Sequence, residues 1–103
     1  MKKFDTPFGH IEILEGTEKV GLSILVIYPG KEIKSHFHRK TKEVEIVLEG
    51  ELSSNSKKFK EGDILIWELN KIHGYKNNTD RNVKVLCITM PPYDEKDVFE
   101  VKK

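Results

Sequence analysis

The segment from Pro29 to Glu51, PGKEIKSHFHRKTKEVEIVLEGE, carries the strongest structural signal in the chain. It contains His36 and His38 one residue apart, Glu43 five positions later, and a glycine near either end. In a strand, His36 and His38 project to the same side, roughly 6.6 Å apart at about 3.3 Å per residue. Two imidazoles at this separation can converge on one metal ion, with bonds of about 2.0–2.2 Å. The segment therefore predicts part of a metal site carried by a strand.

Further ligands depend on how the chain turns and on which other histidines approach. Glu43 reaches the same ion only if the chain turns after His38, and the polar residues 39–42 (RKTK) suit such a turn. A fourth ligand has two candidates, His10 and His73. His73 is favoured because it opens a short strand that follows the apolar run ILIW and a turn. His10, close to the N-terminus, is more typical of a surface histidine.

Residues 43–52 (EVEIVLEGEL) alternate in the manner of a strand. One face carries Val44, Ile46 and Leu48, and the other carries Glu43, Glu45, Val47 and Glu49. The glutamate face either points to solvent or lines the polar lumen of a barrel, with the aliphatic row packed outside it. The local pattern is compatible with both arrangements.

The rest of the chain indicates an all-β fold. Segments rich in aliphatic and aromatic residues alternate with glycine, proline and asparagine, as is typical of an antiparallel sandwich or barrel: HIEILEG, KVGLSILVIYPG, EIKSHFH, EVEIVLEGEL, KKFKEGDILIWEL, KIHGYKN and VKVLCITMPP. The chain contains no alanine, the best helix former. Only the tail from Tyr93 onward is expected to form a short helical turn, with Asp94 as its N-cap after Pro91 and Pro92.

Composition narrows the classes of function. The 103 residues suit a single domain spanning 1–103, and the formal net charge of +1 argues against a nucleic-acid partner. The longest nearly apolar run, VGLSILVIY, is far shorter than the ~20 residues of a membrane span, so no membrane association and a cytoplasmic location are expected. Cys87 lies in an apolar run and is expected to be buried. Abundant lysine and glutamate with no glutamine resemble a thermophile composition.

Two motifs resemble those of a small single-domain cupin of the conserved-barrel, cupin type-2 kind. The first, over residues 30–50, reads Gly30, KEIKS, His36, Phe37, His38, RKTK, Glu43, VEIVLE, Gly50. The second, over residues 62–77, reads Gly62, DILIW, Glu68, Leu69, Asn70, KI, His73, GYK, Asn77. Glu68 stands where the family has proline, and Asn70 stands where it has glycine. Asn70 is a mild change because asparagine tolerates the left-handed conformation, whereas Glu68 removes rigidity from the turn.

The resemblance implies a double-stranded antiparallel β-barrel of the jelly-roll type. It also implies one divalent transition metal (Fe, Mn, Ni, Co or Zn) bound by His36, His38, Glu43 and His73, with open positions for substrate. Many cupins of this size form homodimers, and the row of Val44, Ile46 and Leu48 on the outer face suits such contact.

Two functions follow as expectations from this resemblance. The first is a metal-dependent enzyme acting on a small molecule inside the barrel, as a dioxygenase or as an isomerase or decarboxylase. Tyr75, which shares parity with His73 and Asn77, is the candidate catalytic proton or hydrogen-bond donor, and Glu45 is a more remote candidate base. The alternative is a non-catalytic module that binds a sugar or another metabolite through the metal.

Overall fold

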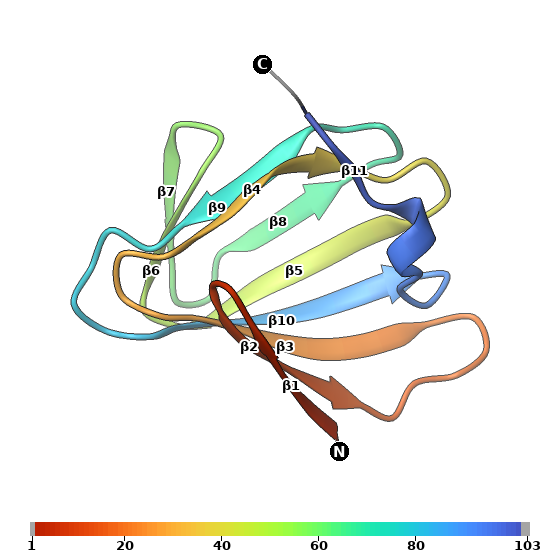
Figure 1. The fold of residues 1–103 in the computed structure, drawn as a ribbon, viewed down its shortest axis with the longest axis horizontal. Helices are drawn as coiled ribbons and strands as arrows, with labels where there is room; N and C mark the ends of the chain where they lie inside the picture. The colour runs from red at the N-terminus through yellow and green to blue at the C-terminus, as the bar shows by residue number, and fades with distance from the viewer. Residues whose placement is uncertain (1, 102–103) are drawn as a thin grey trace.

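The computed structural model describes residues 2–101. They form short strands joined by turns (Figure 1). One 3-10 turn, η1 (Glu95–Asp97), precedes the last strand. The strands are β1 (Lys2–Thr6), β2 (Gly9–Leu14), β3 (Gly21–Ile27), β4 (Glu32–Phe37), β5 (Lys42–Glu49), β6 (Glu51–Ser54), β7 (Lys57–Lys60), β8 (Ile64–Trp67), β9 (His73–Lys76), β10 (Val83–Met90) and β11 (Phe99–Glu100). Among these residues, no helix is long and apolar enough to cross a membrane.

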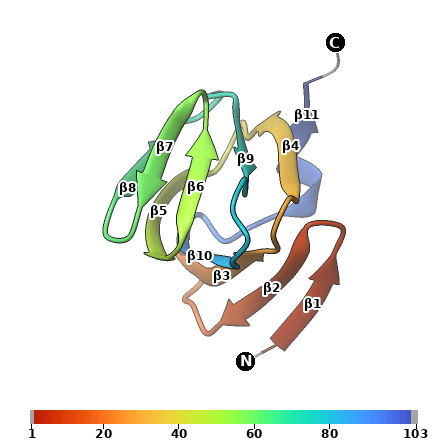
Figure 2. The ribbon, with the colours of Figure 1, turned by 90° about the vertical axis from the view of Figure 1, so that its left-hand side faces the viewer.

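Two antiparallel sheets face each other and curve into a barrel (Figure 2). The six-stranded sheet has the order β1-β2-β3-β10-β5-β8, and the five-stranded sheet has the order β11-β4-β9-β6-β7. The predicted all-β antiparallel barrel is therefore confirmed. Strands β4 and β9 of one sheet lie across from β5 of the other, so residues 32–49 and 73–76 share one lumen (Figure 1).

The orientation of β5 settles the alternative that the local sequence leaves open. Glu43, Glu45 and Val47 are buried, whereas Leu48 on the opposite face is 41% exposed. The glutamate face therefore points into the barrel, and the aliphatic row lies outside. A half-buried strand normally shows the reverse arrangement, so its inversion identifies the lumen as polar in this region.

Gly50 corrects the prediction of one continuous strand over residues 43–52. The chain breaks there, and β5 and β6 belong to different sheets. Gly50 has φ of 85°, and an added Cβ would lie 2.9 Å from the carbonyl oxygen of Asn82. Only glycine meets both conditions without strain, because other residues rarely adopt this φ. The glycine that closes the first motif therefore turns the chain from one sheet to the other.

The ends of the chain hold two strands that the sequence pattern does not predict, β1 and β11. Each is a sheet edge, where pairing on one side leaves little hydrophobic alternation to read. The expected turn in the tail is confirmed as η1, and the Asp94 side chain accepts a hydrogen bond from the Lys96 N–H at 2.9 Å.

The apolar core lies between the two sheets. Its buried members are Ile27, Val47, Leu52, Leu65, Trp67, Tyr75, Val83 and Val85. Cys87 is also buried, as predicted. Since Trp67 and Tyr75 belong to this core and also border the polar part of the lumen, core packing and the candidate site share side chains.

Candidate metal centre

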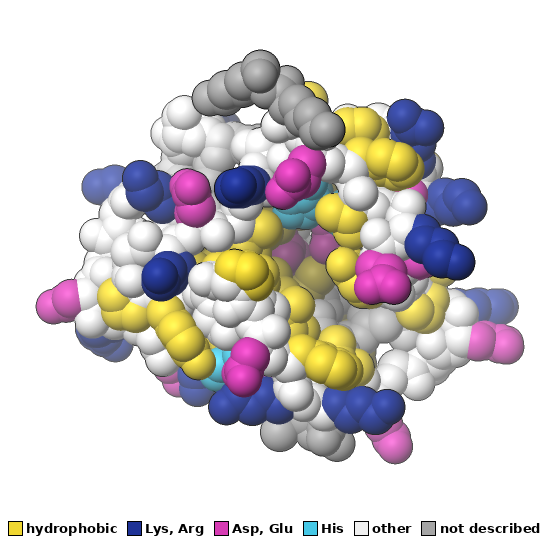
Figure 3. Space-filling model, in the orientation of Figure 1, with side chains coloured by type: hydrophobic (Ala, Val, Ile, Leu, Met, Phe, Trp, Pro, Cys, Tyr) yellow, Lys and Arg dark blue, Asp and Glu magenta, His cyan; other side chains and the backbone are white. Residues whose placement is uncertain are grey.

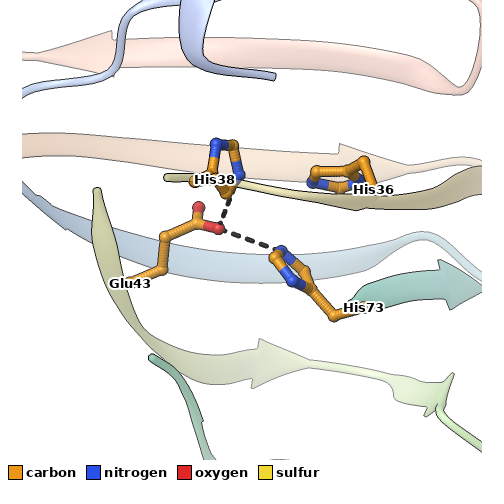
Figure 4. A group of neighbouring side chains, drawn as sticks. All are labelled: His36, His38, Glu43 and His73. Atoms are coloured by element: carbon orange, nitrogen blue, oxygen red, sulfur yellow. Dashed lines mark ion pairs between the residues drawn. The ribbon is translucent and has the colours of Figure 1, made fainter. Parts of the chain in front are cut away.

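Four side chains from both sheets meet inside the barrel (Figure 4). His36 lies near the end of β4, His38 follows that strand, Glu43 projects from β5, and His73 begins β9. One donor atom from each residue lies within 4.8 Å of the others. The structure thus brings together all four residues predicted as ligands, including the carboxylate across the turn and the histidine some thirty residues away.

In each of the three histidines, ring nitrogen Nδ1 is hydrogen-bonded to a backbone carbonyl, and this bond determines whether the other ring nitrogen, Nε2, carries a proton. Nδ1 of His36 lies 2.8 Å from the carbonyl oxygen of Lys34. Nδ1 of His38 lies 2.9 Å from the carbonyl oxygen of Asp97, and Nδ1 of His73 lies 2.9 Å from that of Lys71. A carbonyl only accepts, so each Nδ1 carries the proton and donates it. In a neutral ring with its proton on Nδ1, Nε2 is unprotonated and carries a lone pair. An unprotonated imidazole nitrogen is the form that binds metals.

The lone pairs of His38 and His73 converge on a carboxylate oxygen of Glu43, which likewise cannot donate a hydrogen bond. Glu43 Oε1 lies 3.0 Å from Nε2 of His38 and 3.0 Å from Nε2 of His73 (Figure 4). Despite these short separations, none of the three atoms has a partner in hydrogen-bond geometry among residues 2–101, and all three are buried. Converging buried acceptors are costly unless a cation or a proton lies between them. The donor set and its burial therefore fit a divalent cation.

The electrostatics of the cluster favour the binding of a cation. Burial raises the pKa of Glu43, but the adjacent His38 and His73 imidazoles outweigh this and hold it well below the ordinary value. Burial lowers the pKa of His38, but the Glu43 carboxylate raises it overall, whereas burial dominates and lowers the pKa of His36. The Glu43 carboxylate is thus ionised, and its negative charge attracts a cation.

Asp97 supports the cluster from the C-terminal segment, a role that the sequence does not reveal. Its carbonyl oxygen accepts from His38 Nδ1, and its side-chain carboxylate accepts from three backbone N–H groups at 3.0–3.1 Å, those of Arg39, Lys40 and Thr41. These residues form the turn between His38 and Glu43. Asp97 therefore holds the turn on which the convergence of His38 and Glu43 depends.

Tyr75 and Glu45 lie beside the cluster rather than in it. The Tyr75 hydroxyl donates a hydrogen bond to Glu45 Oε1, and the centroids of the Tyr75 and His73 rings are 5.8 Å apart. Glu45 is fully buried. Asn77, which shares parity with His73 and Tyr75, donates to the carbonyls of Ile27 and Arg81 and closes a loop.

The other residues discussed from the sequence lie away from the cluster. His10 is on β2, buried rather than exposed, and contacts the Tyr28 hydroxyl and Glu12. Glu68 pairs with Lys42 at 3.0 Å on the surface. Asn70 has φ of 65°, which confirms that asparagine adopts the left-handed conformation there.

One face of the molecule carries a hollow. Figure 3 shows a hollow near the middle of this face, with acidic side chains inside it and a histidine at its edge. His36 is the least buried of the four cluster residues.

The fold and the motifs identify the family. The family profile described as "Cupin domain" matches residues 23–89, which include the whole cluster. The chain belongs to the cupin family. No curated protein matches its sequence.

Solved structures share the fold at low sequence identity. An uncharacterised protein with a double-stranded β-helix domain from Klebsiella pneumoniae is 23% identical, with a TM-score of 0.77 over 88% of this chain and 77% of its own. KdgF from Halomonas sp. is 16% identical, with a TM-score of 0.82 over 93% of this chain and 91% of its own. Oxalate decarboxylase from Lactobacillus farciminis, solved with formate, is 19% identical, with a TM-score of 0.81. It matches 97% of this chain, but this chain spans only 33% of its length.

Proposed function

We propose that this cupin binds one divalent transition metal through His36, His38, Glu43 and His73 and acts with it on a small molecule inside the barrel. The observation that carries the proposal is the convergence of buried imidazole Nε2 atoms and Glu43 Oε1, whose lone pairs have no hydrogen-bond partner among residues 2–101. Three imidazoles and a carboxylate suit Fe, Mn, Ni, Co or Zn in the divalent state.

A metal held by these four residues would supply a Lewis acid with positions left for substrate. The protein's own side chains define the rest of the site. The Nδ1 bonds to backbone carbonyls fix the direction of each Nε2, and the core side chains Trp67 and Tyr75 keep water from the inner side of the cluster. The fold neighbour named oxalate decarboxylase supports catalysis on a small molecule as one use of this barrel.

A non-catalytic module that binds a metabolite or sugar is the second candidate. The observation that favours it is the position of the Tyr75 hydroxyl, which donates to Glu45 and not toward the cluster. Because the Tyr75 hydroxyl already donates its proton to Glu45, it does not offer that proton to a substrate at the cluster. Under this alternative, the same four residues anchor a ligand without turning it over.

Metal analysis of protein purified without added metal tests the shared part of both candidates. We expect close to one metal ion per chain in the wild type, and loss of the metal in His36→Ala and His73→Ala. His10→Ala is the matched control and should retain the metal, because His10 lies on β2 outside the cluster. Metal retained in both cluster variants would refute the site.

Turnover separates the two candidates. Oxygen uptake by the iron-loaded protein is measured across thiols, diketones and flavonols, and product formation is followed for carboxylic and keto acids. Consumption of any of these supports the enzyme. A metabolite that raises the melting temperature of the metal-loaded protein, but is not consumed, supports the binding module.

A further inference from the structure

Glu45 is a buried carboxyl group that the metal cluster does not use. It lies on the inner face of β5, two residues after Glu43, with no exposed surface. Its Oε1 accepts hydrogen bonds from the Trp67 indole N–H at 2.6 Å and from the Tyr75 hydroxyl. Among residues 2–101, no cationic side chain pairs with it. Because burial of a carboxyl group is costly unless it is hydrogen-bonded, Glu45 depends on these two donors for its place in the core.

Trp67, the donor to Glu45, lies against a ring of the cluster. Its indole stacks on the His73 imidazole with ring centroids 4.7 Å apart and only 7° between the planes. Trp67 ends β8 of one sheet, and His73 begins β9 of the other. The stack therefore joins the two sheets at the metal cluster.

The strand register explains how Glu45 reaches Trp67. Glu43 lies directly opposite Trp67 on β5 and β8, and Glu45 lies opposite Leu65. The Glu45 side chain thus meets the indole along a diagonal, a distance that long side chains span on one sheet face. An indole N–H in a buried site needs an acceptor, and Glu45 provides it.

His73 is restrained in two independent ways. The bond from Nδ1 to the Lys71 carbonyl sets the tautomer and the direction of the ring, at 2.9 Å. The indole stack sets the plane of the ring, because rotation of the imidazole would break the parallel contact. Together they aim Nε2 at Glu43 Oε1, 3.0 Å away.

We propose that Glu45 is a positioning residue for the metal centre. It holds the Trp67 indole in place, and the indole holds His73 in the plane that directs Nε2 into the cluster. This inference rests on the metal-binding function proposed above. It adds two residues, Glu45 and Trp67, that act on the metal only through His73.

The single tryptophan of the chain makes the arrangement measurable. Since Trp67 stacks on a ligand, Co²⁺ bound by His73 should quench its fluorescence, so titration with Co²⁺ yields the affinity directly. The visible spectrum of the Co²⁺ protein reports the ligand arrangement independently. Both readouts apply without any substrate.

Four variants test the positioning role. Glu45→Leu removes the acceptor for the indole N–H, whereas Glu45→Gln keeps an acceptor oxygen. We expect Glu45→Leu to bind Co²⁺ about 10-fold more weakly with a changed visible spectrum, and Glu45→Gln to stay within about threefold of wild type, since partners that orient a ligand typically contribute 10–100-fold. Glu49→Leu and Glu49→Gln, on the exposed end of the same strand, are the matched controls and should leave both readouts unchanged.

A double-mutant cycle shows whether the effect passes through the indole. In a Trp67→Phe background, which keeps a ring on His73 but removes the N–H donor, Glu45→Leu should cause little further loss of Co²⁺ affinity. Affinity is read here from the visible spectrum. Additive losses would mean that Glu45 acts independently of Trp67 and would overturn the inference.

The outcomes separate this inference from the proposed function. Wild type that binds no Co²⁺ refutes both. Wild-type binding with unchanged affinity and spectrum in Glu45→Leu overturns only the positioning role. If Glu45→Leu does not fold, Trp67→Phe decides by itself: the inference requires a changed Co²⁺ spectrum, because the freed ring can tilt, and an unchanged spectrum overturns it.

Discussion

The carbonyl oxygen of Asp97 accepts a hydrogen bond from Nδ1 of His38 at 2.9 Å, across 59 positions of the chain. The carboxylate of the same residue receives the backbone N–H groups of the turn that follows His38. One residue in the C-terminal segment therefore orients a predicted ligand and shapes the turn leading to the next one.

Asp97→Ala should weaken both the fold and the metal centre. Three backbone N–H groups lose their acceptor, as when a capping residue is removed, so we expect a loss of about 1–2 kcal/mol in the free energy of unfolding. Metal affinity should fall as well, because the turn between His38 and Glu43 loosens. Urea denaturation and Co²⁺ titration measure the two effects.

Asp94→Ala is the control for this prediction. Asp94 also caps a turn, by accepting from the Lys96 N–H, but it makes no hydrogen bond to the segment between β4 and β5. Its substitution should leave Co²⁺ affinity unchanged. Equal losses of affinity in the two variants would show that the whole C-terminal segment matters, and not the contacts of Asp97.

Glu43→Gln should separate metal binding from the stability of the metal-free protein. An amide can donate to an imidazole Nε2 where the carboxylate cannot, so the metal-free variant should be at least as stable as the wild type. Metal at 100 times its dissociation constant should stabilise the wild type by about 2.7 kcal/mol and the variant by much less. Melting curves with chelator and with Ni²⁺ provide the comparison, and an equal metal-induced shift in both proteins contradicts it.

The stability of the metal-free protein should fall as pH rises from about 4.5 to about 7. Burial and the neighbouring Glu43 charge raise the pKa of Glu45 from 4.5 to about 7. Between these values, folded Glu45 keeps a proton that the unfolded chain has released, so rising pH favours unfolding. Above about pH 7, both states are ionised and the contribution of Glu45 becomes constant.

Comparison with Glu45→Gln isolates this contribution. The difference in unfolding free energy between the two proteins should change by up to roughly 3 kcal/mol across the window, at about 1.4 kcal/mol per pKa unit. Other titrating groups largely cancel in the difference. Urea denaturation in chelator at several pH values measures it, and a difference that does not vary with pH would show that the pKa of Glu45 is not raised.

The outer face of the six-stranded sheet should form a homodimer contact, as the aliphatic row of β5 predicts. Val44 and Ile46 lie directly opposite Ile66 and Ile64 of β8, which are 55% and 58% exposed. Burying this strip against a second copy would remove apolar surface from water. We expect a dimer by light scattering, and a monomer when Ile64→Lys and Ile66→Lys are combined.

Phe4→Lys provides the control for the dimer. Phe4 is 53% exposed but pairs with Ile11 on the opposite face of the sheet, so its substitution should leave the dimer intact. A wild-type protein that remains monomeric at high concentration would contradict the expectation.

The sequence by itself determined the features that depend on local spacing, namely which residues share a strand face and where the chain turns. The period of two in residues 43–49 placed Glu43 and Glu45 on one face, and His36 and His38 followed from the same rule. Gly30, Gly50 and Gly62, together with Asn70, marked turns because few residues adopt a positive φ. The two motifs by themselves indicate the barrel and the four cluster residues.

Only the tertiary structure decided which face of β5 is inside and what supports the cluster. Alternation is symmetric between inside and outside, so burial of the glutamate face depends on the opposing sheet. The bond from His38 to Asp97 and the stack of Trp67 on His73 join segments from different parts of the barrel. Such contacts leave no local periodicity, because they arise from the packing of the two sheets and not from neighbouring residues in the chain.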